Sequence, residues 1–337
     1  MPEPAQEPVP VGEPARPGAQ PPPAPLAAGT PVAATTFADQ ARLRAASAGL
    51  AVEVRSQARM ALDRFFHHRM ALTGLGIFLF LLLLSTVGPL FWRYDYAQIT
   101  NQFSTSPTLQ HPFGTDTIGH DTFAQVMQGT ATSIKTALLV AVLATVVGTA
   151  IGAVAGYYGK LADAALMRFT DLILIVPVVA ILLVLANGVS SVASNWFWIA
   201  VVLAAVLWTY LARLVRGTFL SLREREFVEA EWAIGASDAR IILRHMIPNA
   251  IGPIVVNATL TVANAMLIEA FLSFLGLGIQ PPAVSLGNLI ANHQADATVL
   301  PWLFFFPAGF LVLAILSVNF IGDGLRDALD PSQRVRA

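Results

Sequence analysis

Residues 71–92 read ALTGLGIFLFLLLLSTVGPLFW, a stretch that contains no charged side chain. A helix rises about 1.5 Å per residue, so roughly 20 apolar residues are needed to cross a hydrocarbon core about 30 Å thick. The stretch is therefore long enough to span a membrane. It follows a long N-terminal segment, whereas a signal peptide has a short basic start and a short apolar core. We therefore predict an uncleaved transmembrane helix here.

Runs of similar length recur along the chain and define its fold class. We predict six transmembrane helices, at residues 71–92, 134–157, 166–187, 195–215, 249–274 and 301–322. Only 12% of the 337 residues are charged and 55% are hydrophobic, whereas a soluble domain carries about 25% charged residues. The sequence therefore predicts an all-α, polytopic membrane protein with a transmembrane domain over residues 71–322.

The segments that flank this domain have different compositions. Residues 1–36 are rich in Pro, Ala, Gly and Gln, and we predict a disordered cytoplasmic tail because such a segment buries too little apolar surface to fold. Residues 37–70 interleave arginines with apolar residues, which is typical of a basic amphipathic helix lying on a membrane surface. We assign residues 323–337 to a cytoplasmic C-terminal tail.

The distribution of basic residues predicts the orientation of the chain. With a cytoplasmic N-terminus, only Arg93 and Lys135 of the 20 Lys and Arg residues lie on the outer side. Cytoplasmic segments carry an excess of such residues. We therefore expect both termini in the cytoplasm and an outer loop over about residues 93–133. A second outer segment, about 276–299, is expected to re-enter the membrane or to cap the outer face.

The sequence offers no support for catalysis by this chain. Its lack of cysteines excludes disulfides, thiolate metal sites and cysteine nucleophiles. The nearest approach to a phosphate-binding loop, residues 152–160, lacks the required Gly at Val154 and the Ser or Thr at Leu161. The histidines do not show the His-Glu-x-x-His spacing of a metal site. We therefore expect no enzymatic activity, no metal or cofactor bound by this chain, and no nucleic-acid partner.

The cytoplasmic loop between the fourth and fifth spans, residues 216–248, carries the most distinctive pattern. Its section 222–248 reads LREREFVEAEWAIGASDARIILRHMIP. This predicts two short helices joined by a turn, with Gly235 in the left-handed conformation that ends one helix and Ser237 capping the next. A short rigid helix held off the membrane suits insertion into a groove on another protein. The alternative is a solvated charged loop that only links two spans.

This loop resembles the cytoplasmic EAA loop of importer permeases in the ATP-binding-cassette class. The residues that carry the resemblance are Glu229, Ala230, Gly235, His245, Pro248 and Asn249. Further matches, in order along residues 60–335, resemble the C-type permease of dipeptide, oligopeptide and nickel importers. They are His111-Pro112-Phe113-Gly114-Thr115-Asp116 with Gly119 and Asp121, Gly156-Tyr157-Tyr158-Gly159, Phe274-Leu275-Gly276-Leu277-Gly278, and Gly322-Asp323-Gly324-Leu325-Arg326-Asp327.

Some positions depart from the family pattern. Glu231 stands where the loop usually has a second Ala, and His120 stands where the outer loop usually has Arg. Gln125 and Thr132 stand where that outer signature tends to be more basic. These departures bear on the detailed contacts of the loop and on what the outer loop recognises.

The resemblance implies a type I importer permease fold, with a coupling-helix loop, in the bacterial inner membrane. It implies a channel-forming subunit that pairs with a second homologous permease, two ATP-binding-cassette ATPase subunits and an extracytoplasmic solute-binding protein. ATP and Mg²⁺ would bind the ATPases, which would dock on the cytoplasmic loop. The docking residues that it implies are Arg225, Glu226, Glu229, Ala230, Ala233, Gly235, Ser237 and Asp238. Resemblance alone favours peptides as the substrate, and nickel complexes or other small solutes stay open.

Polar residues on the fifth span are candidates for the translocation path. Asn257, Thr261 and Asn264 lie on one helical face. Glu269 is an acid inside the same span, which is costly unless it faces a cavity or a partner. The three residues of this face could instead form hydrogen bonds between helices, and Glu269 is expected near the outer end of the span, where water could reach it. An alternative function is a secondary transporter driven by an ion gradient, with Glu269 as the proton site, and a third is a membrane scaffold.

Overall fold

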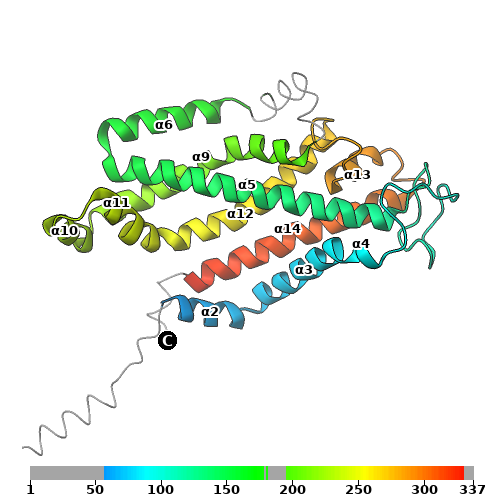
Figure 1. Ribbon diagram of the computed structural model, residues 1–337, viewed down its shortest axis with the longest axis horizontal. Coiled ribbons are helices and arrows are strands. Elements are labelled where there is room, and N and C mark those ends of the chain that lie inside the picture. Colours follow the sequence, from blue (N-terminus) through cyan, green and yellow to red (C-terminus); the bar gives the residue numbers. More distant parts are fainter. Residues whose placement is uncertain (1–56, 178–179, 181–194, 330–337) are drawn as a thin grey trace, which may run out of the picture. The chain divides into compact units, whose positions relative to one another are not determined.

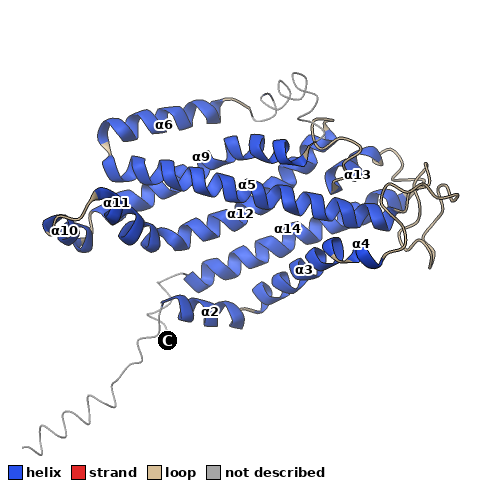
Figure 2. Ribbon diagram, in the orientation of Figure 1, coloured by secondary structure: helices blue, strands red, loops and turns tan. Residues whose placement is uncertain are grey.

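The structure is a computed structural model that describes residues 57–177, 180 and 195–329. Helix is the regular secondary structure of these residues, and no strand occurs among them (Figure 2). The expected all-α fold is therefore confirmed. The predicted disordered tail, 1–36, lies outside the described residues, as does the predicted lead-in helix up to residue 56.

Five continuous helices in the described part of the chain are long and apolar enough to cross a membrane. They are α3 (Arg69–Thr86), α5 (Thr122–Tyr158), α9 (Trp196–Arg223), the helix Asp238–Phe274 and α14 (Pro301–Leu329). The helix Asp238–Phe274 consists of α11 (Asp238–Arg240), a π-helical stretch (Ile241–Met246) and α12 (Ile247–Phe274). The shorter helices are α2 (Gln57–His67), α4 (Gly88–Phe91), α6 (Lys160–Ile175), α10 (Glu226–Ala233) and α13 (Leu286–Asn292). These five long helices correspond to five of the six predicted spans (Figure 1).

The remaining predicted span, 166–187, begins in α6. This helix ends at Ile175, and Val176 takes an extended conformation because the residue before a proline, here Pro177, is disfavoured in the α region. Most of the rest of the predicted span falls on residues 178–179 and 181–194, which are outside the described residues. The third span therefore stays a prediction.

Two ion pairs attach α6 to α9. Arg216 donates from Nε and Nη2 to both carboxylate oxygens of Asp163, a bidentate geometry that holds a guanidinium in a fixed orientation. Arg213 donates from Nη2 to Asp171 Oδ1 at 2.6 Å. Because both arginines lie on one helix and both aspartates on the other, α6 is fixed against α9 near both of its ends.

The second span starts earlier than predicted. We predicted an outer loop up to residue 133 and a helix from 134, whereas α5 begins at Thr122 and Asp121 caps it by accepting a hydrogen bond from Ala124 N at 2.7 Å. Residues 122–133 contain several polar side chains, which led to the loop prediction. The helix accommodates two of them internally, since Thr130 and Thr132 donate to the backbone carbonyls four residues earlier.

The last span ends later than predicted. We predicted a span to residue 322 followed by a tail from 323, whereas α14 continues to Leu329. Gly324 packs against Ala71 of α3, and an added Cβ would lie 2.2 Å from the Ala71 Cβ. Phe65, Ala71 and Ala328 form a small buried cluster there. This packing against α2 and α3 keeps the segment helical beyond the apolar run, and residues 330–337 lie outside the described part.

The closest helix pair is α5 and α9, which make the most extensive contact between any two described helices and run side by side in Figure 1. Gly148, Gly152 and Gly156 of α5 recur every four residues and face α9. A Cβ added to any of the three would lie 2.4–2.7 Å from an α9 atom, too close to be accommodated without a shift. Small residues of this kind let two helix backbones approach closely in a membrane.

We predict that Gly152→Ala destabilises the protein and that Gly217→Ala does not. Both substitutions replace a helical glycine by alanine, and this replacement by itself favours the helix by about 1 kcal/mol. The Cβ at 152 would lie 2.4 Å from the Ala212 carbonyl oxygen, whereas the Cβ at 217 would meet no atom within 4 Å. We expect overpacking at 152 to cost about 1–3 kcal/mol and to lower the melting temperature of the detergent-solubilised protein. Equal melting temperatures for the two variants would contradict this account of the α5–α9 contact.

Candidate functional site

The segment between α9 and α12 forms a helical hairpin at one end of the bundle, where Figure 1 labels α10 and α11. We call this segment, residues 225–240, the α10 tip. Helix α10 ends in a turn closed by two backbone hydrogen bonds, from Gly235 N to Trp232 O at 3.0 Å and from Ala236 N to Glu231 O at 3.0 Å. Gly235 has φ +78°. This pair of bonds around a left-handed glycine is the Schellman motif that terminates helices. The predicted left-handed conformation of Gly235 at the end of this helix is confirmed.

The eight residues predicted to dock a partner all lie on the exposed side of this tip. Arg225, Glu226, Glu229, Ala230, Ala233, Gly235, Ser237 and Asp238 are each exposed. Ile234 is 78% exposed as well. Beneath them, Val228 is fully buried and packs in a cluster with Phe219, Ile241 and Met246. The tip therefore presents an acidic, small-residue surface above an apolar anchor.

Tyr157, at the end of α5, fixes the tip from below. Its hydroxyl donates to Asp238 Oδ1 at 2.7 Å and accepts from Trp232 Nε1 at 3.0 Å. The guanidinium of Arg223 lies 5.8 Å from the Trp232 ring centroid, within the range of a cation–π contact. One phenol thus connects α10, α11 and α5, and the neighbouring Gly156 belongs to the close α5–α9 contact.

The second predicted helix of the loop is not a separate element. Ser237 occupies the expected cap position, but its side chain makes no capping hydrogen bond. The helix that begins at Asp238 runs without a break to Phe274. Its π-helical stretch ends at Met246, two residues before Pro248, whose ring would clash with the carbonyl of residue 244 in an α-helix. The wider turn relieves this clash. The second half of the predicted loop is therefore the first part of the fifth long helix.

The departure from the family pattern at Glu231 has a partner in the structure. Glu231 Oε1 lies 3.3 Å from His245 Nε2. Glu231 belongs to α10 and His245 to the π-helical stretch, so the contact crosses the turn. The side chain that replaces the usual alanine therefore adds a polar link between the two arms of the tip. The spacing in the sequence gave no sign of this pairing.

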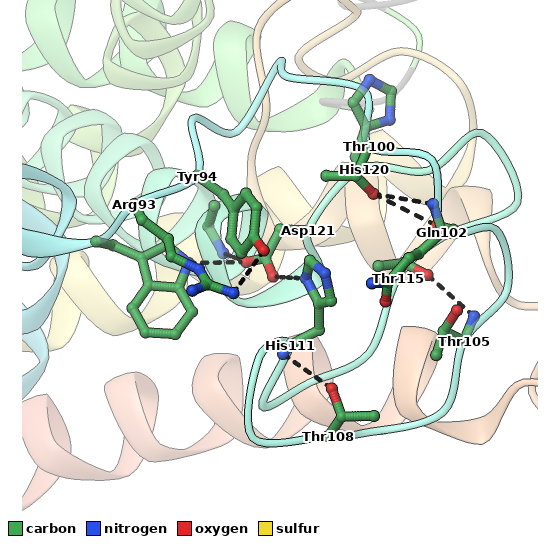
Figure 3. A network of polar contacts seen from close by, with 12 residues as sticks. Arg93, Tyr94, Thr100, Gln102, Thr105, Thr108, His111, Thr115, His120 and Asp121 are labelled. Carbon is green, nitrogen blue, oxygen red and sulfur yellow. Dashed lines mark hydrogen bonds and ion pairs between the residues drawn. The ribbon is translucent and has the colours of Figure 1, made fainter.

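The opposite end of the bundle carries residues 92–121, which fold around two buried aspartates, Asp116 and Asp121; Figure 3 shows the contacts of Asp121. Asp121 is fully buried and accepts from Trp92 Nε1 at 3.1 Å, in addition to capping α5. Its second oxygen lies 2.6 Å from His111 Nδ1. Asp116 Oδ1 accepts from three consecutive backbone amides, at residues 118, 119 and 120. The family residues of this outer signature therefore hold the loop together.

His120, the second departure, takes part in the same network. Its Nδ1 lies 2.8 Å from Asp116 Oδ2. Gln125 Nε2 donates to the same oxygen at 3.4 Å. A histidine in place of the family's arginine thus still supplies a partner for the aspartate. Helix α13 packs beside this region on α5, α12 and α14. The segment after α12 therefore folds back on the bundle, and its re-entry into the membrane or capping of the outer face stays a prediction.

Three of the four residues predicted for the translocation path lie on one face of α12, and Glu269 lies apart from them. Asn264 is exposed, and Asn257 and Thr261 are half-buried. Asn257 lines a cavity of about 480 Å³ together with Tyr210 of α9 and Arg326 of α14. Thr261 donates to the Asn257 carbonyl oxygen at 2.8 Å. These three residues therefore form a stripe on the free face of α12.

Glu269 lies on a different side of α12 and is 1% exposed. Its Oε1 accepts from Ser273 at 2.9 Å and from Ser285 at 2.8 Å, and its Oε2 accepts from Ser133 at 3.4 Å. Because Ser133 belongs to α5 and Ser285 precedes α13, the carboxyl group connects three elements. The structure gives Glu269 a bonding role inside this chain, and its place on the path stays a prediction.

These features define a polytopic, all-helical transport permease, and comparison with known proteins gives its family. Residues 148–335 match the family model of the binding-protein-dependent transport system inner membrane component. Residues 56–112 match the N-terminal transmembrane domain of oligopeptide transport permease C. The chain belongs to the family of binding-protein-dependent transport system inner membrane components.

Curated relatives cover most of the chain. The oligopeptide transport system permease protein of Mycobacterium tuberculosis is 40% identical over 283 residues, which are 84% of this chain and 97% of that protein. The protein of the same description from Haemophilus influenzae is 40% identical over 286 residues, 84% of this chain and 91% of that protein. The resemblance found in the sequence is therefore confirmed.

We predict that Tyr157→Phe loosens the tip without unfolding the protein. Loss of the hydroxyl removes the acceptor of Trp232 Nε1 and the donor to Asp238, which we expect to cost about 1–2 kcal/mol locally. Backbone amides of residues 226–240 should then exchange hydrogen roughly tenfold faster. The matched control is Tyr158→Phe, because this hydroxyl makes no hydrogen bond within the described residues. Unchanged exchange in Tyr157→Phe would show that the hydroxyl does not fix α10.

Proposed function

We propose that the chain is the membrane-spanning subunit of an ATP-driven importer for peptides. Its family membership supports the importer class, and the oligopeptide permeases among its relatives support peptides as the solute. The observation that carries the proposal is the exposed, rigidly anchored α10 tip. Such a tip suits a groove on a separate protein that hydrolyses ATP.

In this proposal the α10 end faces the cytoplasm, with both termini on the same side, and the loop 92–121 faces outward. The α10 end and the two terminal segments carry an excess of Lys and Arg, and this supports the orientation because such residues concentrate on the cytoplasmic side. Two ATPase subunits bind ATP and Mg²⁺ and hold the α10 tips of this chain and of a second, homologous permease. A solute-binding protein delivers the peptide at the opposite end. This chain itself carries out no hydrolysis.

The mechanism that follows is alternating access. When ATP closes the ATPase pair, the α10 tip moves with its groove, and the Tyr157 contacts transmit the movement to α5. The close glycine-mediated contact makes α5 and α9 move as one body. The permease then needs only two packings that are close in free energy. The stripe on α12 with Asn257, Thr261 and Asn264 supplies hydrogen-bonding groups where the second permease would complete the path.

We predict that Gly235→Val uncouples ATP hydrolysis from uptake, whereas Gly235→Asn keeps them coupled. The position has φ +78° and an added Cβ would meet no atom within 4 Å, so the cost of valine is backbone strain of about 1–2 kcal/mol. Asparagine tolerates this conformation. Both variants should assemble in the membrane. The measurement is the number of peptides imported per ATP hydrolysed in proteoliposomes.

Normal coupling in Gly235→Val would contradict the role of the turn as a lever. Equal loss in both variants would assign the effect to a side chain clashing with the docked partner. The comparison therefore separates backbone geometry from the surface that the partner covers.

The secondary transporter is the competing function, and Glu269 tests it. Glu269→Gln keeps the oxygen that accepts from Ser273 and Ser285, so we expect a stability loss below about 1.5 kcal/mol and retained ATP-driven uptake. We also expect a protonophore to leave wild-type uptake unchanged when ATP is held constant. Uptake that collapses with the proton gradient, and is lost in Glu269→Gln, would favour the secondary transporter.

A further inference from the structure

Two adjoining cavities lie at the end of the bundle opposite α10. The first, of about 510 Å³, lies between the loop that contains Asp116, the start of α5, and residues 281–293. The second, of about 240 Å³, continues along α5. Tyr96 and residues 282–284 line both. The two cavities therefore form one continuous groove, which we call the α5 groove.

One wall of the α5 groove is a polar face on a helix that is otherwise largely apolar. Gln125 lines the first cavity, and Gln128, Thr132 and Lys135 line the second. These residues are spaced by three, four and three positions, which places them on one face of the helix. A polar face of this kind in a membrane protein lies against water, a ligand or another protein, because lipid cannot satisfy it.

Gln125 leaves an acceptor without a partner at one end of the groove. Its side chain is 8% exposed. Its Nε2 donates to Asp116 Oδ2, and this bond fixes the amide orientation because a carboxylate can only accept. Its Oε1 is buried and has no hydrogen-bond partner among the described residues. Because this oxygen is closed to solvent, it acts on a ligand in the groove through its partial negative charge, which favours a cation at this end.

The carboxylate of Asp116 lines the same end and makes it attractive to a cation. Its oxygens are already occupied by backbone amides, Gln125 and His120. The group therefore acts on a ligand through its charge.

Lys135 gives the other end the opposite charge. It is exposed and makes no ion pair with the described residues. The rest of the chain contains one further lysine, Lys160, which lies at the start of α6, beyond the far end of α5. The walls between the two ends include Tyr96, Trp196 and Pro282, which offer apolar contact without demanding a particular side chain.

The length of the groove indicates the size of the ligand. Ten residues separate Gln125 from Lys135, which corresponds to about 15 Å along a helix. An extended peptide spans about 3.3–3.6 Å per residue, so about four or five residues match this length. We propose that the α5 groove binds a free oligopeptide of about four residues, with its N-terminal ammonium at Gln125 and its C-terminal carboxylate at Lys135. This inference rests on the proposed function and assigns a peptide site to this chain itself.

Site occupancy can be tested directly because the chain contains no cysteine. Gln128→Cys places a thiol in the α5 groove, and Leu109→Cys places one on the loop, where the side chain is fully exposed. Both variants are assembled with their partner subunits in nanodiscs and alkylated with a water-soluble reagent. Saturating tetra-alanine should slow alkylation of Cys at 128 about fivefold or more, by mass action. It should leave Cys at 109 unaffected.

The discriminating ligand is N-acetyl-tetra-alanine amide, which has the same length and no terminal charges. It should protect neither thiol. Equal protection by the free and the blocked peptide would overturn the assignment of the two ends. A thiol at 128 that is unreactive in the assembled complex would show that another subunit covers the groove, and this would overturn the proposal as well.

Transport gives a second test with a matched pair of variants. Lys135→Gln should lower the uptake efficiency for tetra-alanine about tenfold, the size expected from a lost charge-assisted hydrogen bond, and should leave uptake of tetra-alanine amide unchanged. Lys160→Gln removes the other lysine and should behave as the wild type. Equal uptake efficiency for tetra-alanine in Lys135→Gln and wild type would overturn the groove site alone. Absence of ATP-dependent peptide uptake in the wild type would instead overturn the proposed function.

Discussion

The close contact between α5 and α9 is the constraint on which the rest of the structure depends. Three glycines at four-residue spacing leave no room for side chains, so the two helix backbones pack directly against each other. Tyr157 extends this contact to the α10 tip. At the other end α5 carries the polar face of the α5 groove and is capped by Asp121. One helix therefore reaches from the contacts of the α10 tip to the α5 groove.

A second constraint is the cost of burying charge, and the chain meets it in the same way at three positions. Asp116, Asp121 and Glu269 are each at most 4% exposed. Backbone amides, an indole and serine hydroxyls supply their hydrogen bonds. Bonds of this kind compensate for the lost hydration of an acid. They also fix the loop 92–121 and α13 onto the ends of α5 and α12, so the groove has a defined shape before any ligand binds.

Periodicity and composition predict the spans and the turn at Gly235, because a long apolar run and a left-handed glycine are local properties. The start of α5 could not be predicted in this way, since its threonines become acceptable in a helix only through hydrogen bonds to their own backbone. The glycine spacing of α5 is a sequence signature of close helix packing, but the sequence does not identify α9 as the helix that packs there. The pairing of Glu231 with His245, and of Glu269 with Ser133, depends on tertiary contacts that no spacing reveals.

The central claim is that a separate ATP-hydrolysing subunit holds the α10 tip. The most direct measurement places a single cysteine at exposed Glu229, in a chain with no other cysteine, and applies a short thiol-directed cross-linker to the assembled complex. The account predicts a cross-link to the ATPase subunit and slow alkylation of the thiol by a soluble reagent. A thiol that reacts as freely in the complex as in the isolated chain, and forms no such cross-link, would contradict it.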